Sequence, residues 1–228
     1  MGAKIANDLL SLGAKVALLD KAPPLISHRN SQTFQGDLTD PKFVQDSIDT
    51  VANGSRLHYL VNAAGVLWFQ HDKSATTIDL KIWDEVMLIN LKTVVHTCRA
   101  AIPHIKEAGG GAIVNISTTQ CYRGDHKPQD AYQAAKAGVI ALSKSLAVQF
   151  ASDCIRVNTL VPGPTETPMQ KRWRTDGDLI QRTAANIPLG RVAQPSDMSN
   201  AALFLLSDLA GYITGTELIV DGGYLAQP

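Results

Sequence analysis

Short apolar runs alternate with longer segments of helical periodicity along the whole chain. The apolar runs predict strands over residues 15–19, 33–35, 57–62, 112–116, 155–161 and 217–220. Apolar residues at helical spacing predict helices over residues 3–12, 41–52, 80–106, 131–151 and 196–207, the second with Asp40 as N-cap and Pro41 at its first position. This alternation indicates an α/β fold: a doubly wound parallel sheet with helices on both faces, in three layers.

No linker, repeat or low-complexity block divides the series, so we expect one domain over residues 1–228. One segment departs from the alternation, because residues 162–191 are rich in proline and glycine and show no clear period. A long connection of this kind in a compact α/β domain is usually functional. We expect a flap over the carboxyl ends of the strands, where open α/β sheets bind their ligands.

Composition argues against several classes of partner. Lys plus Arg number 21 and Asp plus Glu number 21, so the formal net charge is zero and no basic field is available for nucleic acid or an anionic membrane. No stretch approaches the roughly 18 apolar residues of a membrane span. Cys98, Cys121 and Cys154 form no CxxC pair and the six histidines form no HxxxH pattern, so we expect neither a metal site nor a disulfide framework. A cytoplasmic location is the default expectation.

The clearest candidate chemistry is a Y-x-x-x-K pair in the helical segment AYQAAKAGVIALSKSLA. Tyr132 and Lys136 are four residues apart, which places both side chains on one helical face. A free tyrosine has a pKa of about 10, and an adjacent ammonium lowers it, so the pair could act as a general acid or base. The same spacing occurs by chance in many amphipathic helices, so a structural role stays open on this pattern alone.

Polar residues elsewhere could complete such a site. Ser117, Thr118 and Thr119 follow the strand-like run 112–116, so a parallel sheet would deliver a hydroxyl to its ligand-binding edge. Asn90 lies in a largely apolar helical segment, where an asparagine needs either a buried hydrogen-bonding partner or a catalytic role. Both interpretations of Asn90 stay open.

Small residues and one acidic residue indicate where a dinucleotide could bind. Asn62, Ala63 and Gly65 end the run LVNAAG, where missing side chains let a flat ligand approach the backbone, although a tight turn would use the same residues. Asp20 ends the first strand, at the position of an acidic residue that accepts hydrogen bonds from a ribose diol and repels a 2′-phosphate. This favours NAD over NADP, and the adjacent Lys21 could soften the preference.

Short motifs follow one another in a characteristic order. They are Asp20, GDL at 36–38, NAAG at 62–65, Asn90, NIST at 115–118, YQAAK at 132–136, PGPTET at 162–167, IPLGR at 187–191 and VDGGY at 220–224. The ordered set resembles the short-chain dehydrogenase/reductase family over the whole chain. The resemblance implies a Rossmann-type fold, a nicotinamide cofactor, and hydride transfer between a secondary alcohol and a ketone.

The resemblance also assigns roles by position. Tyr132 is implied to be the proton donor or acceptor, Lys136 to lower its pKa and bind the nicotinamide ribose, and Asn90 to hold a relay water. Thr118 stands where the family usually has serine, one residue further from the tyrosine than usual, so Ser117 or Thr119 could substitute. The implied cofactor-binding residues, besides Tyr132 and Lys136, are Asp20, Asp37, Leu38, Asn62, Ala63, Gly65, Pro162, Gly163, Thr165 and Thr167.

Within the family, residues 165–173 (TETPMQKRW) and the tail from residue 187 are most similar to dehydrogenases of 2,3-dihydro-2,3-dihydroxybenzoate in siderophore biosynthesis. The implied substrate is that cyclic alcohol, whose oxidation with NAD leads to an aromatic catechol. Its carboxylate would need a cation, for which Arg123, Arg172 and Arg174 are candidates, and Met169 and Trp173 could wall its ring. The alternatives are a generic ketone or 3-oxoacyl reductase, another cyclic-alcohol dehydrogenase, and a non-catalytic dinucleotide-binding protein.

The resemblance has consequences for assembly and for the amino terminus. Family members are usually tetramers, with the helices around Asn90 and Tyr132 at one interface and the final strand near Val220 at another, so we expect a homotetramer. They begin with a strand and a T-G-x-x-x-G-x-G turn, whose last residues Met1 and Gly2 resemble. That strand would lie between the first and third strands of this chain. We therefore expect the native protein to begin upstream and the first strand to be absent here.

Overall fold

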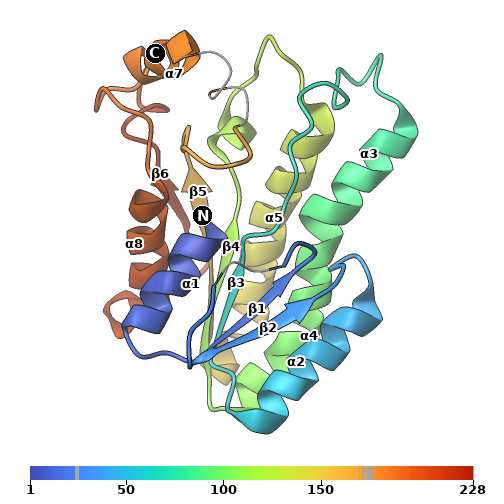
Figure 1. Ribbon diagram of the computed structural model, residues 1–228, viewed down its shortest axis with the longest axis vertical. Coiled ribbons are helices and arrows are strands. Elements are labelled where there is room, and N and C mark those ends of the chain that lie inside the picture. The colour runs from blue at the N-terminus through green and yellow to red at the C-terminus, as the bar shows by residue number, and fades with distance from the viewer. Residues whose placement is uncertain (24–25, 171–172, 174–176, 228) are drawn as a thin grey trace.

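The computed structural model describes residues 1–23, 26–170, 173 and 177–227. Its elements alternate along the chain as the hydrophobic pattern predicts (Figure 1). In order they are α1 (Gly2–Ser11), β1 (Val16–Asp20), β2 (Ser31–Gln35), α2 (Pro41–Gly54), β3 (Tyr59–Asn62), α3 (Leu80–Met87), the π-helical turn η1 (Leu88–Lys92), α4 (Thr93–Glu107), β4 (Gly111–Ile116), the 3-10 turn η2 (Thr119–Tyr122), α5 (Asp130–Gln149), η3 (Ala151–Asp153), β5 (Ile155–Pro162), α7 (Gly177–Ala185), α8 (Pro195–Leu206), η4 (Asp208–Ala210) and β6 (Glu217–Val220).

All the predicted strands are present, and every strand pair is parallel. β1 pairs with β2, while β3, β4, β5 and β6 form a second sheet in that order. In register, Leu18 lies opposite Thr33 and Val61 opposite Val114. Among the described residues, no strand pairs with the second edge of β1 or of β3, which are the two edges between which the sequence placed a further strand.

Side chains of β4 alternate between the two faces of its sheet and so define two cores. Val114 and Ile116 pack with Ile5 of α1 and Met198 of α8. Ile113 points the other way, into a cluster with residues of α2, α4 and α5. Figure 1 shows α1 and α8 on one side of the strands and α2, α4 and α5 on the other. The three-layer, doubly wound α/β arrangement predicted from the sequence is confirmed.

Two segments differ from their predicted structure. Residues 80–106, expected as one helix, form α3, the π turn η1 and then α4. The segment 162–191, expected to be irregular, contains the helix α7, and its residues Leu179, Ile180 and Ala184 pack against Ile187 and Val192. The described part of this segment therefore forms a small apolar unit rather than an open loop.

Three further observations concern the part of the chain that the structure describes. No helix there is both long enough and apolar enough to cross a membrane. No group of histidine, cysteine, aspartate and glutamate side chains is arranged there to hold a metal ion. Cys98, Cys121 and Cys154 are all free thiols.

Candidate active site

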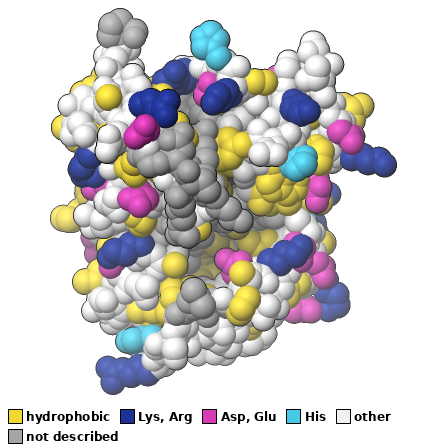
Figure 2. Space-filling model, turned by 45° about the horizontal axis from the view of Figure 1, so that its top comes forward, with side chains coloured by type: hydrophobic (Ala, Val, Ile, Leu, Met, Phe, Trp, Pro, Cys, Tyr) yellow, Lys and Arg dark blue, Asp and Glu magenta, His cyan; other side chains and the backbone are white. Residues whose placement is uncertain are grey.

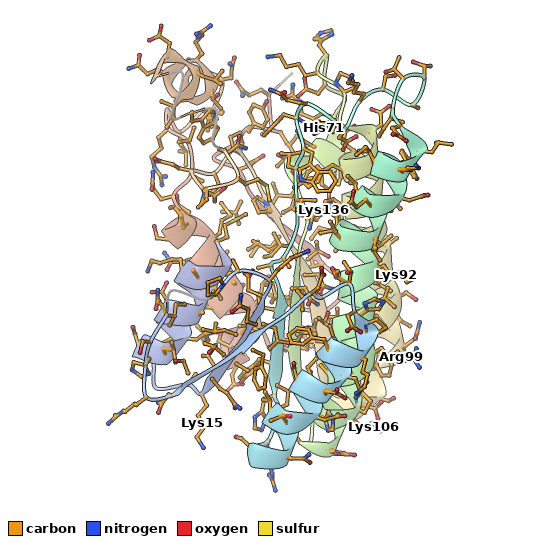
Figure 3. All side chains as sticks on the ribbon, turned by 45° about the vertical axis from the view of Figure 1, so that its right-hand side comes forward. Lys15, His71, Lys92, Arg99, Lys106 and Lys136 are labelled. Atoms are coloured by element: carbon orange, nitrogen blue, oxygen red, sulfur yellow. The ribbon has the colours of Figure 1, made fainter. Side chains whose placement is uncertain are left out.

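Residues from three elements meet around the phenol of Tyr132. Tyr132 and Lys136 lie one turn apart on α5, with only 7% and 4% of their surfaces exposed. Thr118 follows β4 directly, and its hydroxyl hydrogen-bonds with the phenol. The Lys136 Nζ atom donates to the carbonyl of Ile116, at the end of β4, over 2.9 Å. Figure 3 shows Lys136 inside the molecule, below the loop that carries His71.

The structure distinguishes the three neighbouring hydroxyl residues. Ser117 is buried, and its Oγ donates to the backbone carbonyl of Lys136 over 2.9 Å, so it links β4 to α5. Thr119 is also buried, at the first position of η2. Thr118 alone of the three is half-buried and in contact with Tyr132. Thr118 is therefore the one of the three whose hydroxyl meets the Tyr132 phenol, despite its longer distance in sequence from the tyrosine.

Asn90 lies in the π turn η1 and is completely buried. Its Oδ1 accepts a hydrogen bond from the backbone of Val66, and its Nδ2 donates to the carbonyl of Val86, each over 3.0 Å. A Cβ atom at Gly65 would lie 2.7 Å from Asn90 Oδ1 and 3.5 Å from Lys136 Nζ, so only glycine fits there. Asn90 thus joins the loop after β3 to the end of α3, in a π turn of the kind often found at functional sites.

Burial sets the protonation of both catalytic candidates. Burial raises the pKa of Tyr132, and the electrostatic interaction with Cys121 raises it further. The hydrogen bond from Thr118 acts in the opposite direction. Burial also lowers the pKa of Lys136 to about 8. The expectation that Lys136 lowers the pKa of Tyr132 is thus corrected for the protein on its own: the ammonium is directed at the Ile116 carbonyl, and loss of hydration dominates.

Asn62 was predicted to bind the cofactor, but in the structure its side chain forms hydrogen bonds inside the protein. Its Nδ2 donates to Asn115 Oδ1 over 2.8 Å, and its Oδ1 accepts from Thr97 Oγ1 over 2.7 Å. Asn115 continues the chain to Ser143 of α5, again over 2.8 Å. These buried bonds connect β3, β4, α4 and α5 beneath the site, so any contact of Asn62 with a ligand falls to its backbone.

The carboxyl ends of β1 and β2 carry the acidic residues predicted for the adenosine half of a dinucleotide. Asp20 is exposed at the end of β1 and accepts a hydrogen bond from the Ala22 backbone over 2.9 Å. Asp37, just after β2, forms an ion pair with Lys21 at 2.7 Å. That bond and those from Thr39 lower the pKa of Asp37 to about 2. The adjacent Leu38 packs against the core, so its side chain forms a wall there.

The amino terminus of α1 lies at the same edge. A Cβ atom at Gly2 would be 3.3 Å from that of Ala63, at the end of β3. No side chain caps α1 at Met1, so its first amides and the helix dipole are available to an anion such as a pyrophosphate. With the close approach at Gly65 and the acidic pair on β1 and β2, these donors and acceptors fit a nicotinamide dinucleotide.

The loop after β5 forms the beginning of the flap. Gly163 follows Pro162 and has no room for a side chain, because its Cβ would lie 2.7 Å from Asp221 Cα. Thr165 is buried, with its hydroxyl bonded to the Gly163 carbonyl over 2.8 Å. Thr167 is half-buried beside a cavity of about 220 Å³. Figure 2 shows this end of the molecule hollowed near its centre, with hydrophobic side chains in the hollow and charged ones around it.

The predicted substrate residues are not all gathered at the site. The Arg123 guanidinium stacks 4.7 Å above the ring of Tyr224, so it is engaged in a cation–π contact. Trp173 is buried against Ile187 and Val192, and its Nε1 has no hydrogen-bonding partner. Met169 is half-buried in the flap. Arg172 and Arg174 lie outside the described residues.

Sequence reasoning missed one buried residue beside the site. Asp72, in the loop between β3 and α3, accepts hydrogen bonds from the backbone of Ala131 and Tyr132. The loop has no motif or period that would single out this aspartate.

Known proteins resemble the chain over nearly its full length. The family model described as enoyl-(acyl carrier protein) reductase matches residues 1–225. D-threitol dehydrogenase of Mycolicibacterium smegmatis is 36% identical, over 98% of this chain and 88% of that protein. Cis-4-hydroxycyclohexanecarboxylate dehydrogenase of Sinomonas cyclohexanicum is 37% identical, over 99% of this chain and 92% of that protein. A solved structure of an ElxO variant with NADPH bound has a TM-score of 0.90 at 27% identity, covering 99% of this chain and 94% of that one.

These likenesses agree with the order of motifs and with the geometry around Tyr132. The chain belongs to the short-chain dehydrogenase/reductase family, oxidoreductases of Rossmann-like fold that act on CH–OH groups with a nicotinamide dinucleotide.

Proposed function

We propose that this enzyme oxidises a secondary alcohol of a small cyclic or polyhydroxylated compound, with NAD as the hydride acceptor. The observation that carries the proposal is the meeting of Tyr132, Thr118, Lys136 and Asn90 at the carboxyl edge of the sheet. A phenol and a second hydroxyl in contact can hold one alcohol oxygen between them. The loop after β3 leaves room beside them because Gly65 has no side chain.

Each residue has its own task in this reaction. Bound NAD supplies the acceptor for the hydride that leaves the carbinol carbon. Thr118 Oγ1 would hold the substrate oxygen. Tyr132 Oη, after giving its own proton to water, would take the hydroxyl proton as the hydride leaves for the cofactor, so that the alcohol becomes a ketone. Lys136 would hold the nicotinamide ribose through its ammonium group. Asn90 holds a water through which the proton leaves.

The variant Tyr132→Phe tests the proposal, because it removes a single oxygen and keeps the packing. We expect kcat to fall by about 10³-fold, the range for loss of a general base, while the Kd for NADH changes less than about twofold. Steady-state rates and NADH fluorescence measure the two quantities. Thr118→Ser serves as the matched control and retains most of the rate. Unchanged turnover in Tyr132→Phe would refute the assignment, and NADH binding without turnover by the wild type would favour the non-catalytic alternative.

The substrate class rests on the relatives and on the flap motif. The two relatives reported above act, by their names, on a polyol and on a cyclic alcohol that carries a carboxylate. Neither is a dihydrodihydroxybenzoate dehydrogenase, so 2,3-dihydro-2,3-dihydroxybenzoate remains a prediction from the sequence likeness of residues 60–67, residues 165–173 and the tail from residue 187. Threitol, cis-4-hydroxycyclohexanecarboxylate and that diol form the test panel, each with NAD. Faster reduction of an acetoacetyl thioester than oxidation of any member would favour a 3-oxoacyl reductase instead.

The preference for NAD follows from charges at the ends of β1 and β2. Asp20, exposed at the end of β1, would accept hydrogen bonds from the ribose diol and repel a 2′-phosphate. Lys21, the cation that could attract that phosphate, is paired with Asp37, and Thr39 holds the same carboxylate through its backbone amide and its hydroxyl. The pair is exposed, so it contributes only modestly to binding. It nevertheless keeps the ammonium directed away from a second phosphate.

Breaking the ion pair between Asp37 and Lys21 should therefore weaken the preference for NADH over NADPH. In Asp37→Asn we expect the ratio of the Kd for NADPH to that for NADH to fall about threefold, since an exposed pair is worth about that much. The ratio cancels any adenine contact that Asp37 makes, because both cofactors share it. The same change in a Lys21→Met background should leave the ratio within about 1.5-fold, as should Asp46→Asn, which breaks the comparable pair with Lys42. An equal fall in both backgrounds would show that Lys21 plays no part.

The remaining features of the proposal are the assembly of the protein, its flap and its location in the cell. We propose a homotetramer of single-domain chains, each with residues 162–191 as the flap over its substrate. The surfaces expected to meet expose apolar side chains, Val95 on α4, Val148 on α5 and Ile219 on β6. Three free cysteines suit the reducing cytoplasm that we propose as the location.

A further inference from the structure

Asp72 is a buried carboxylate remote in sequence from the catalytic helix that it touches. Its side chain is 1% exposed, in the loop between β3 and α3. Oδ1 accepts the amide of Ala131 over 3.1 Å and Oδ2 accepts the amide of Tyr132 over 2.8 Å. Both amides belong to the first turn of α5, where no intrahelical acceptor exists. Gln129, the N-cap residue, makes no capping bond of its own with its side chain. Asp72 thus caps the helix from another part of the chain.

A second bond joins the same two segments in the opposite direction. Asp130 Oδ2, on the first turn of α5, accepts the amide of Ala75 over 2.8 Å. The loop itself is tied back, because the amides of His71 and Asp72 both donate to the Trp68 carbonyl over 2.9 Å. Trp68 also packs in the apolar cluster that contains Tyr132. The loop and the start of α5 are therefore one rigid unit.

The energetics favour a specific role for this carboxylate. Among the described residues no cation pairs with Asp72, so its charge is stabilised by the two amides and the dipole of α5. Burying such a group costs free energy, and burial correspondingly raises the pKa of Asp72 while the two amides oppose that rise. A helix cap at the surface would avoid that cost. What the buried position adds is a fixed direction for the backbone of Tyr132.

We propose that Asp72 is a positioning residue for Tyr132, which orients the phenol toward Thr118 by fixing the first turn of α5. This inference rests on the proposed function, in which Tyr132 exchanges the proton of the alcohol. A displacement of the reacting group by about 1 Å costs up to about 10²-fold in rate. The role therefore predicts a loss in kcat rather than in cofactor binding.

The test compares three variants of the full-length chain. In Asp72→Ala we expect kcat to fall about 30-fold, with KM and the Kd for NADH within about threefold. Asp72→Asn keeps one acceptor oxygen and should recover part of the loss. Asp130→Ala removes the other, more exposed bond between the same segments and should stay within about threefold of the wild-type rate. Thermal unfolding of each variant shows that the compared proteins are folded, and Asp72→Asn serves if Asp72→Ala does not fold.

A purely structural cap would give a different pattern. If Asp72 acts through the phenol, Asp72→Asn should have no further effect on the residual kcat in a Tyr132→Phe background. An undiminished effect there, or equal losses in Asp72→Ala and Asp130→Ala, would overturn the inference.

The wild-type rate tests the proposed function independently of this inference. If the wild type turns over no alcohol, amide hydrogen exchange still tests whether Asp72 holds the first turn of α5 through its two hydrogen bonds. Asp72→Asn should accelerate exchange at Ala131 and Tyr132 at least about tenfold while Val139, further along α5, is unchanged. Unaltered exchange at Ala131 and Tyr132 would show that Asp72 does not fix the first turn of α5.

Discussion

Among single residues, Lys136 combines a charge with nearly complete burial. Its pKa falls from an ordinary 10.5 to about 8, so at neutral pH the folded protein holds an ammonium that the unfolded chain would hydrate better. The shift corresponds to a cost of about 3 kcal/mol in the free energy of unfolding. Below about pH 8 both states carry the proton and the full cost applies. Between about pH 8 and 10.5 only the unfolded state binds it, so stability rises with pH.

Replacing Lys136 should therefore stabilise the protein while abolishing its activity. We expect Lys136→Met to raise the free energy of unfolding by about 2 kcal/mol near pH 7, after about 1 kcal/mol is lost at the unpaired Ile116 carbonyl. The gain should shrink as pH rises from about 8 to 10.5. Urea unfolding at a series of pH values measures it. Lys144→Met, at an exposed lysine of the same helix, is the control. If Lys136→Met raised the free energy of unfolding by the same amount at every pH, the argument would be contradicted.

The predictability of the site differs from residue to residue. Tyr132 and Lys136 were found as a pair from local spacing, because residues on one helix face keep their relation in any α/β fold. Strand position gave only a group of three hydroxyl residues, from which the family resemblance selected Thr118. Asp72 was not, since it contacts backbone amides 59 and 60 positions away and its partners depend on the path of a loop. The protonation of Tyr132 was also misjudged, because burial cannot be measured from spacing.

At the scale of elements, every predicted helix and strand exists, and the errors lie where tertiary contacts decide the geometry. The π turn η1 has the same apolar periodicity as the helices on either side. The side chain of Asn90 bonds from this turn to the backbone of Val66, a contact that exists only once the loop after β3 has folded against it. The helix α7 was hidden for another reason: the prolines before it obscured a short amphipathic stretch that packs inside the flap.

For the whole molecule, strand order could be predicted less well than strand position. Hydrophobic runs locate strands but do not show which pair, and the expectation of a further strand beside β1 and β3 came from the family resemblance. The structure pairs β1 with β2 alone and places β3 at the end of a four-stranded sheet. The two covering layers, by contrast, follow from alternation within β4, where Val114 and Ile113 face different helices.

The outer surfaces of these layers lead to a prediction for assembly. Val148 is 82% exposed near the end of α5 and Val95 is 41% exposed on α4, so an apolar surface is available where the two helices cover the sheet. In the proposed tetramer these side chains are buried between chains, and light scattering should give about four times the mass of one chain. Val148→Lys combined with Val95→Lys should reduce that mass, because a buried lysine without a partner opposes association. Leu12→Lys, at an equally exposed leucine beyond α1, should leave the mass unchanged. A wild-type protein that stays monomeric at micromolar concentration would refute the assembly while leaving the site within each chain intact.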